Sequence, residues 1–467
     1  INAALNTKDE NDSPEEHFTD TIKAACGLAD PNAVWGMTQA APELVHWLLK
    51  LGVKFNMSGY DDVDLRNFGG QKKKRTAFAQ SDTGKQIMTA MIDAVRRKEA
   101  SGMVERFSHH SFLTLRLCGN ICCGCVIRDE YSQETVELPG DAVIVATGGM
   151  HGLFGNTTGS LSNTGEVTAE LFRLGVPLAN AEMIQYHPTT VKCGGKRMLI
   201  SEAARGEGGR LFAMKDGKQW YFMEEKYPEL GNLMPRDITA REIWKVSHES
   251  EVFLDMTEIS EEIISNKLSG LADDCMTYLH KDIRKEPVSV LPGIHYFMGG
   301  ILVDEQHRTP IQNLYAAGEC CAQYHGANRL GGNSLLGALY GGRVAAKSAC
   351  EQADVVDLSC ATQIDFPPAS QISEIKQLNK VMHETMGVVR NENTLLNGIQ
   401  TVQALTGNLP LLGMAVLKSA LARKESRGAH WREDYPKSND DDYLKTTVAR
   451  FDGKQIQISF VPVPERR

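Results

Sequence analysis

Long apolar runs are missing from this chain of 467 residues. No stretch approaches the roughly 20 apolar residues of a membrane-spanning helix, so any membrane attachment has to come through a partner. Positive net charge is missing too, because 50 basic and 59 acidic side chains leave a net charge of −9, and an acidic chain is a poor match for nucleic acid. Internal repeats and low-complexity tracts are also absent. The remaining composition, 42% hydrophobic and 23% charged, is typical of a globular enzyme with two or three domains.

Cysteine is present, and its spacing suggests a metal site that other observations oppose. Cys118, Cys122, Cys123 and Cys125 stand close together among eleven cysteines, as ligands of a metal or an iron–sulfur cluster would. Residues 113–127, however, predict two strands of a hairpin. Adjacent strand residues point to opposite faces, so these cysteines cannot easily share one metal. We expect no metal site, and free thiols along the chain favour a reducing compartment.

The most informative segment is residues 325–336, His-Gly-Ala-Asn-Arg-Leu-Gly-Gly-Asn-Ser-Leu-Leu. It places a histidine and an arginine beside a glycine pair, and an apolar helix then begins. The start of a helix offers free backbone N–H groups and the positive end of the helix dipole. This segment therefore predicts a site for an electron-rich or anionic ligand.

Two strand-like segments extend that prediction. Residues 313–319 predict a buried strand that ends in Gly-Glu, and the acid Glu319 is well placed to bind a ribose hydroxyl. Residues 141–149 predict another buried strand, which ends in Ala-Thr-Gly-Gly, where backbone can approach a ligand closely. Together they indicate a dinucleotide site.

At these residues the chain resembles the flavoprotein subunit of succinate dehydrogenase and fumarate reductase, with L-aspartate oxidase as a near relative. Five separated motifs in family order cover most of residues 1–436. The resemblance implies an α/β fold: an FAD-binding domain of the two-dinucleotide-binding type, an inserted α+β capping domain and a helical C-terminal domain. The implied limits are 1–186 and 295–352 for the FAD-binding domain, 187–294 for the capping domain, and 353–467 for the helical domain with a short tail.

The glycine-rich unit G-x-G-x-x-G that opens such a domain does not occur in the sequence. Residues 1–5, Ile-Asn-Ala-Ala-Leu, resemble the family's segment just after that unit, so we expect an N-terminally truncated chain. The same unit includes the region where the family can carry a histidine bonded to FAD. Covalent and non-covalent FAD both stay open.

The resemblance implies that FAD is the cofactor. Residues 81–84, Ser-Asp-Thr-Gly, are either a flavin-contacting segment of the family or a plain helix N-cap. Glu166 stands where the family has Asp, so its carboxylate lies one methylene farther out. The implied FAD contacts are Ala3, Thr147, Gly148, Gly149, Glu166, Glu319, Asn333, Ser334 and Leu335. The last three would meet the flavin ring through backbone groups, and such donors stabilise the anion of reduced flavin.

The implied substrate contacts would clamp a dicarboxylate at both ends. His187 matches a His-Pro-Thr motif and would hold one carboxylate, with Ser201 where the family often has Thr. His295, in His-Tyr-Phe-Met-Gly-Gly, and Arg329 would hold the other. Forked or directional donors fix the geometry of a carboxylate.

Three residues are the implied proton-transfer group. Arg236 matches the family's proton donor, although a guanidinium normally keeps its proton. Glu202 and Arg205, three residues apart on a helical turn, would form the relay that returns a proton to Arg236. The alternative is a surface ion pair that contributes little to stability. Asp237 is either a helix cap or a participant.

The resulting hypothesis is FAD-dependent interconversion of fumarate and succinate by hydride transfer. L-aspartate oxidase, which forms iminosuccinate, is the alternative, and an inactive truncated fragment is a third. Residues 330–334 resemble fumarate reductase more closely than L-aspartate oxidase, and residues 285–288 resemble the dehydrogenase form. The implied partner is an iron–sulfur electron-transfer subunit, with membrane contact through partner subunits alone. The implied location is the cytoplasm or the inner face of its membrane.

Overall fold

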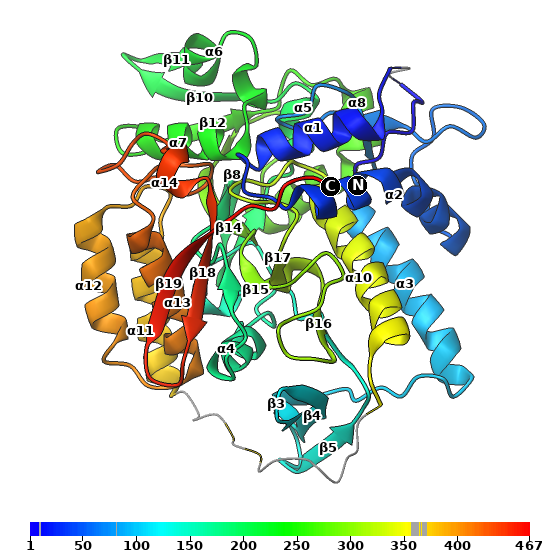
Figure 1. Ribbon diagram of the computed structural model, residues 1–467. Helices are drawn as coiled ribbons and strands as arrows, with labels where there is room; N and C mark the ends of the chain where they lie inside the picture. The colour runs from blue at the N-terminus through cyan, green and yellow to red at the C-terminus, as the bar shows by residue number, and fades with distance from the viewer. Residues whose placement is uncertain (9–10, 81, 356–363, 365, 367–370) are drawn as a thin grey trace.

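The computed structural model describes residues 1–467 apart from 9–10, 81, 356–363, 365 and 367–370. In Figure 1 the blue N-terminal helices and the yellow helix α10 (Asn333–Gln352) lie on one side, and the orange C-terminal helices lie on the other. A green group of strands and helices covers the top of the molecule. None of the helices in the described ranges is both long and apolar enough to cross a membrane.

The segments predicted to form the FAD-binding domain pair strands that are distant in sequence. β6 and β16 run parallel, and β15 runs parallel to β17. Parallel strands joined by long crossovers are the basis of α/β folds. The elements of these segments, besides α10, are α1 (Pro14–Ala24), α2 (Pro31–Leu51), β1 (Leu65–Arg66), β2 (Thr76–Ala77), α3 (Thr83–Ala100), β3 (His110–Cys118), β4 (Ile121–Asp129), β5 (Thr135–Pro139), β6 (Val143–Val145), α4 (Glu166–Arg173), β7 (Leu178–Ala179), β15 (Gly300–Leu302), β16 (Leu314–Ala316) and β17 (Cys321–Ala322).

The sequence predicts a helix over residues 41–51, but helix α2 already begins at Pro31. The Asp30 carboxylate accepts two hydrogen bonds from backbone N–H groups of the first turn, and proline suits the first helical position. Pro42 lies inside the helix. The helix continues past it because the apolar face, with Leu44 only 1% exposed, is buried in a core.

The cysteine-rich segment forms the predicted hairpin, β3 and β4, with Cys118 opposite Ile121 at the turn. The described residues contain no group of three or more side chains arranged to hold a metal ion. Nine described cysteines are free thiols, but Cys118 is disulfide-bonded, so the expectation of free thiols is wrong at that residue.

Two expectations about exposure are also wrong. The strand predicted to be buried leaves Ile144 41% exposed, whereas its neighbour Val145, on the opposite face of the strand, is 4% exposed. The run of three lysines and an arginine at residues 72–75 predicts a solvated loop, but Arg75 is fully buried. It lies 2.7 Å from a carboxylate oxygen of Asp12 and 3.0 Å from one of Asp20. These partners come from a different part of the chain, so local composition carried no sign of them.

The start of α3 also differs from the expectation. Asp82 precedes the helix but makes no side-chain capping bond. The Thr83 hydroxyl instead accepts a hydrogen bond of 3.0 Å from the backbone N–H of Ala79. Ser81, the other candidate cap, lies outside the described residues.

Two antiparallel strands, β8 (Ile184–Cys193) and β14 (Leu291–Phe297), connect the FAD-binding domain to the green cap at the top of Figure 1. Its sheet has the order β11-β10-β12-β13. The cap elements are β9 (Lys196–Leu199), α5 (Glu202–Gly206), β10 (Arg210–Lys215), β11 (Lys218–Trp220), α6 (Phe222–Lys226), α7 (Arg236–Val246), β12 (Val252–Asp255), α8 (Glu261–Lys267), α9 (Ser269–Asp274) and β13 (Val288–Ser289). The domain limits named above stay a prediction.

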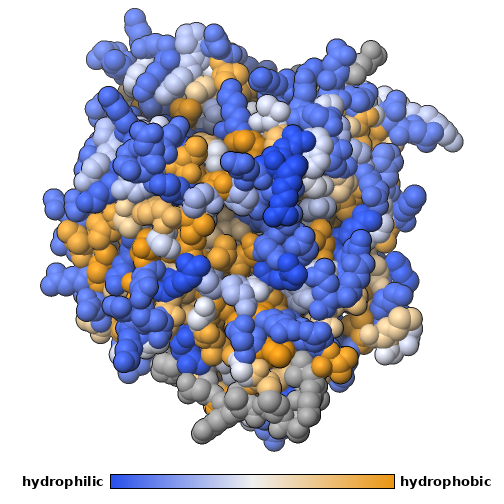
Figure 2. Space-filling model, viewed as in Figure 1, coloured by the Kyte–Doolittle hydropathy of each residue, from blue (hydrophilic) through white to orange (hydrophobic). Residues whose placement is uncertain are grey.

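The C-terminal part is helical, as expected, but its last strands belong to a sheet of the FAD-binding domain. β18 pairs with β7, so the five-stranded sheet has the order β17-β15-β7-β18-β19. Apolar side chains gather over the C-terminal helices on the left of Figure 2, whereas polar side chains cover most of the cap. The elements are α11 (Ile372–Thr385), α12 (Glu392–Val402), α13 (Asn408–Ala422), α14 (Asp440–Tyr443), β18 (Lys445–Phe451) and β19 (Ile456–Pro462).

Candidate active site

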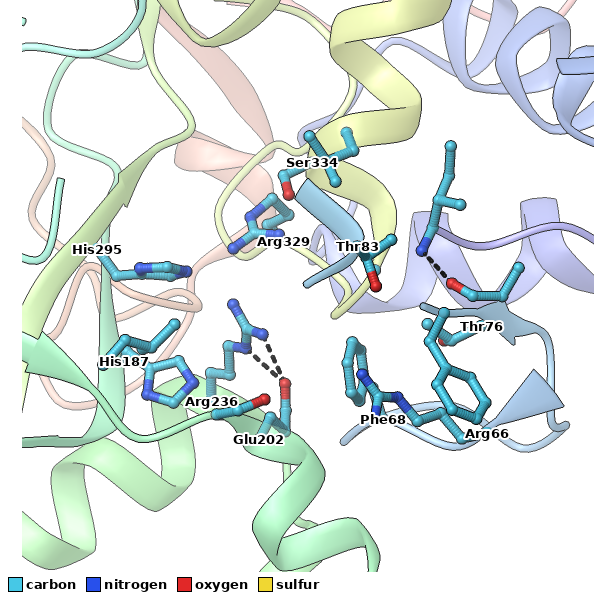
Figure 3. A pocket seen from close by; sticks show the side chains of 17 residues that line it. Arg66, Phe68, Thr76, Thr83, His187, Glu202, Arg236, His295, Arg329 and Ser334 are labelled. Atoms are coloured by element: carbon cyan, nitrogen blue, oxygen red, sulfur yellow. Dashed lines mark hydrogen bonds and ion pairs between the residues drawn. The ribbon is translucent and has the colours of Figure 1, made fainter. Parts of the chain in front are cut away.

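A cavity of about 160 Å³ lies where the cap meets the FAD-binding domain. Side chains from the cap helices, from the two connecting strands and from the start of α10 point into it (Figure 3). The predicted residues that line it are His187, Ser201, Glu202, Arg236, His295, Arg329, Ser334 and Leu335. Arg205 lies directly behind Glu202. The other predicted residues, which include Thr147, Gly149, Glu166 and Glu319, are not among the lining residues.

Glu202 is the centre of a buried ion-pair group. Its Oε2 accepts hydrogen bonds from Nε and Nη2 of Arg236, at 2.9 and 2.6 Å. Its Oε1 accepts from Nη2 of Arg205 at 3.2 Å and from the backbone N–H of Gly69 at 3.2 Å. Burial alone would raise the pKa of Glu202, but the charges of Arg236 and Arg205 outweigh it and the pKa lies below its ordinary value. The surface ion-pair alternative is therefore wrong, because Glu202 and Arg205 are each 2% exposed.

Local sequence explains how Arg236 and Glu202 are placed. Arg236 is the first residue of α7, directly after Pro235, so its side chain leaves the helix at its N-terminal end. Pro235, and not Asp237, occupies the N-cap position. Ser201 caps α5 by accepting a hydrogen bond of 3.2 Å from the backbone N–H of Ala203. Its own O–H stays available as a donor toward the cavity.

Gln185 joins the two cationic sides of the cavity, and the sequence reasoning missed it. Its Oε1 accepts a hydrogen bond of 3.2 Å from Nη1 of Arg236, and its Nε2 donates to the backbone carbonyl of Arg329 at 2.9 Å. The side chain is fully buried. Alternate residues of a strand share a face, so its place two residues before His187 was the available signal.

The two predicted histidines lie side by side at the end of the cavity formed by the connecting strands (Figure 3). Their ring centroids are 5.2 Å apart with an edge-to-face angle of 72°. Backbone atoms of Thr189 contact Nδ1 of His187, and the Thr158 hydroxyl lies 2.7 Å from Nδ1 of His295. Burial lowers the pKa of both imidazoles well below the ordinary value, so both are neutral at physiological pH.

Two further arginines face the cavity. The guanidinium of Arg329 lies 4.3 Å over the ring of Tyr296, and burial followed by the charge of Arg236 lowers its pKa to about 9. Arg66, which the sequence reasoning missed, lies 4.3 Å over the ring of Phe78. Burial lowers the pKa of Arg66 to about 10. Nε of each arginine is buried without a hydrogen-bond partner among the described residues.

The start of α10 forms a further wall of the cavity. Gly332 precedes the helix at a positive φ of 85° and provides no side-chain cap, so the N–H groups of the first turn can face a ligand. Asn333 is held from behind by Asn2 at 2.7 Å and by His17 at 2.9 Å. Ser334 and Leu335 then line the cavity. The neighbouring Ala3 is fully buried and donates its N–H to the backbone of Arg75.

A second group of predicted residues lies around the loop after β6. Oε1 of Glu319 accepts a hydrogen bond of 3.0 Å from the backbone N–H of Phe297. A Cβ atom on Gly149 would lie 2.7 Å from that same oxygen, and Gly148 has a positive φ of 72°. A carboxylate beside a loop with no room for side chains fits the ribose end of a dinucleotide. Thr147 and Glu166 are exposed at the edges of this region.

Comparisons with known proteins agree with this geometry. Residues 1–335 match the FAD binding domain family, and residues 405–466 match the C-terminal domain of the fumarate reductase flavoprotein. The succinate dehydrogenase flavoprotein subunit of Bacillus subtilis is 36% identical, over 100% of this chain and 90% of that protein. L-aspartate oxidase of Nostoc is 31% identical, over 94% of this chain and 84% of that protein.

A solved structure of a mutant FrdA chain from Escherichia coli quinol fumarate reductase superposes with a TM-score of 0.89. The two chains are 26% identical, and the superposition covers 99% of this chain and 88% of that one. This confirms the predicted α/β fold with FAD-binding and C-terminal domains. The chain is an FAD-dependent oxidoreductase of the fumarate reductase and succinate dehydrogenase flavoprotein family.

Proposed function

We propose that the chain interconverts fumarate and succinate, with hydride transfer between FAD and a clamped dicarboxylate. The charge of the cavity carries this proposal. Three arginines, Arg66, Arg236 and Arg329, line the cavity. Glu202 is the one carboxylate among the described lining residues. Glu202 is already neutralised by Arg236 and Arg205. A cavity with uncompensated buried cations favours a dianionic substrate.

The two ends of the substrate are assigned to two pairs of donors. His295 and Arg329 hold one carboxylate, and His187 and Ser201 hold the other. The Thr158 hydroxyl lies 2.7 Å from Nδ1 of His295 and donates to the Ile294 carbonyl at 3.3 Å, so it holds the imidazole ring in one orientation at the end of the cavity. Directional donors at both ends orient the central carbon–carbon bond.

Arg236 delivers the proton to the substrate carbon. Its guanidinium reaches the cavity, whereas Glu202 lies 2.6 Å behind it and Arg205 continues the chain of hydrogen bonds at 3.2 Å. A guanidinium releases a proton only if another group replaces it, and the ionised Glu202 carboxylate is placed to pass a proton from Arg205 to Arg236 in the same step. FAD, when bound, supplies or accepts the hydride.

The residues of this chain that would hold FAD are the start of α10, Glu319 and the loop at Gly149. Gly149→Ala is expected to weaken FAD binding, because the new Cβ would displace the Glu319 carboxylate 2.7 Å away. Losing a hydrogen bond to a charged group corresponds to about a ten- to hundredfold higher Kd. Fluorescence titration of FAD measures this. Gly342→Ala is the matched control, since a Cβ on Gly342 meets nothing within 4 Å; equal affinity in the two variants would remove Glu319 from the FAD site.

The cavity is less suited to L-aspartate, whose ammonium group needs an acceptor. Glu202 is the one carboxylate among the described lining residues, and both of its oxygens already accept hydrogen bonds. A further cation placed beside Arg66, Arg236 and Arg329 would be repelled.

The test uses FAD-loaded protein that is reduced with a viologen dye and then mixed with fumarate. We expect rapid return of the oxidised flavin spectrum with fumarate and none with maleate, which has the same charge but a different shape. Absence of reoxidation by fumarate in flavin-loaded protein, together with oxidation of L-aspartate, would transfer the assignment to aspartate oxidation.

The electron partner is proposed to be an iron–sulfur subunit, with membrane contact through partner subunits. Two relatives support this proposal, because the Bacillus subtilis protein and the 8-methylmenaquinol:fumarate reductase protein of Wolinella succinogenes, at 31% identity, are both flavoprotein subunits. The proposed location is the cytoplasm or the inner face of its membrane.

A further inference from the structure

Helix α7, which begins with Arg236, belongs to two hydrophobic cores. Ala240 packs in the large core that the FAD-binding domain shares with the C-terminal helices, together with Met386. Ile243, about one turn farther along the same helix, packs in the core of the cap. The position of Arg236 therefore depends on the C-terminal domain as well as on the cap.

The polar side of α7 contacts the C-terminal domain through a stacked pair. The guanidinium of Arg241 lies 3.9 Å from the centroid of the Trp431 ring. Asp237, one turn before Arg241, lines the same narrow gap. Burial raises the pKa of Asp237, and the charge of Arg241 opposes that rise. The stack thus joins a cap helix to residue 431 through partly buried side chains.

The loop that carries Trp431, residues 428–431, also contacts the segment that carries Arg329. The N–H of Ala429 donates to the carbonyl of Ala327 at 2.9 Å, two residues before Arg329. Gly428 has a positive φ of 54°, and a Cβ there would lie 2.5 Å from that carbonyl oxygen. The backbone N–H of Arg390 donates to the carbonyl of Trp431 at 2.9 Å, which fixes the other end of the loop.

We infer that the loop 428–431 sets the distance between Arg236 and Arg329, and that Trp431 is a positioning residue for the proton donor. Arg236 would deliver the proton, and Arg329 would hold the substrate that receives it. One loop contacts the segments of both residues, through the Arg241 stack on one side and Ala327 on the other. The roles of the two arginines rest on the proposed function. The contacts of the loop with α7 and with Ala327 do not depend on it.

The effect should be specific to proton delivery. A guanidinium over an indole ring is attracted by the ring face, so removal of the ring loosens α7 around Arg241 while the cap core still holds Ile243. A displacement of about 1 Å at a reacting group can cost about 100-fold in rate. Substrate binding depends on His187, His295 and Arg329, which are not on α7, and should change little.

The experiment compares Trp431→Ala, Trp431→Phe and Arg241→Gln in FAD-loaded protein. We expect Trp431→Ala to lower kcat for fumarate about tenfold with KM within about twofold, and to increase the solvent deuterium isotope effect. Trp431→Phe keeps a ring face and should recover most of kcat. Hydrogen exchange of the backbone over residues 236–246 should be faster in Trp431→Ala and Arg241→Gln.

Tyr221→Ala is the matched control, because it removes a similar stack, with Arg210 at 3.7 Å, inside the cap. It should leave kcat and exchange over residues 236–246 unchanged. Wild-type kcat and exchange in Trp431→Ala would overturn the inference, as would an equal loss in Tyr221→Ala. If Trp431→Ala does not fold, the kcat and the hydrogen exchange of Arg241→Gln test the inference instead. If the unmodified protein does not act on fumarate, the proposed function fails, and hydrogen exchange alone still tests the link.

Discussion

Arg236→Gln is expected to lower kcat by about 10²–10⁴-fold, the usual contribution of a positioned proton donor, while FAD stays bound. Gln keeps a hydrogen-bond donor near the 2.6 Å contact with Glu202 but has no proton to give up. The buried carboxylate also loses its main counter-charge, so its pKa should rise. Steady-state kinetics with a viologen dye measure the rate, and the flavin spectrum measures the bound cofactor.

Two further variants make this result specific. Arg236→Lys keeps the charge but not the fork that donates twice to Glu202, and should recover little activity. Arg210→Gln removes a cap arginine that pairs with Glu224 near the surface and should have wild-type kcat. Turnover retained in Arg236→Gln would exclude Arg236 as the proton donor.

Arg423→Met is expected to lower the free energy of unfolding by about 3–5 kcal/mol, the usual cost of removing one partner of a buried ion pair. All five N–H groups of Arg423 donate hydrogen bonds, and its side chain is 0% exposed. Two of the acceptors are the buried carboxylates of Glu182 and Glu425. Methionine fills a similar volume, so the loss reports the charge rather than a cavity.

Urea unfolding followed by circular dichroism measures this loss, with Arg308→Met as the control. Arg308 pairs with Asp304 at 2.7 Å, an equally short contact, but the two side chains are 49% and 39% exposed. A surface pair of this kind contributes about 0–1 kcal/mol. Similar urea midpoints for the two variants would show that the Arg423 group does not hold the C-terminal domain in place.

The sequence predicted the parts of the site that depend on local spacing. Glu202 and Arg205 touch because they are three residues apart on one helical turn, and Arg236 begins a helix because Pro235 precedes it. Gln185 and Arg66 were missed because their partners, Arg329 and Phe78, are set by the fold and not by neighbours in sequence.

Burial was the hardest property to predict. Arg75 stands in a basic run that is typical of a solvated loop, yet Asp12 and Asp20 neutralise it in the interior. The strand at Ile144 has the composition of a buried strand, but the large core covers the face that carries Val145 and leaves Ile144 exposed. In both cases a contact between distant segments decided the outcome, and residue type at the position itself did not.

The pairing of β18 with β7 has a consequence for how the protein is made. Ala179 of β7 can pair with Val448 of β18 only after Val448 has been translated, more than half the chain later. Until then one edge of β7 has unpaired backbone groups, and an open edge is prone to pair with other chains. The segment that includes Gln185 and His187 follows β7 directly. Synthesis of the last strands is therefore the step that completes the sheet next to the substrate clamp. A chain released before β18 is made would keep an unpaired strand edge that is prone to aggregate.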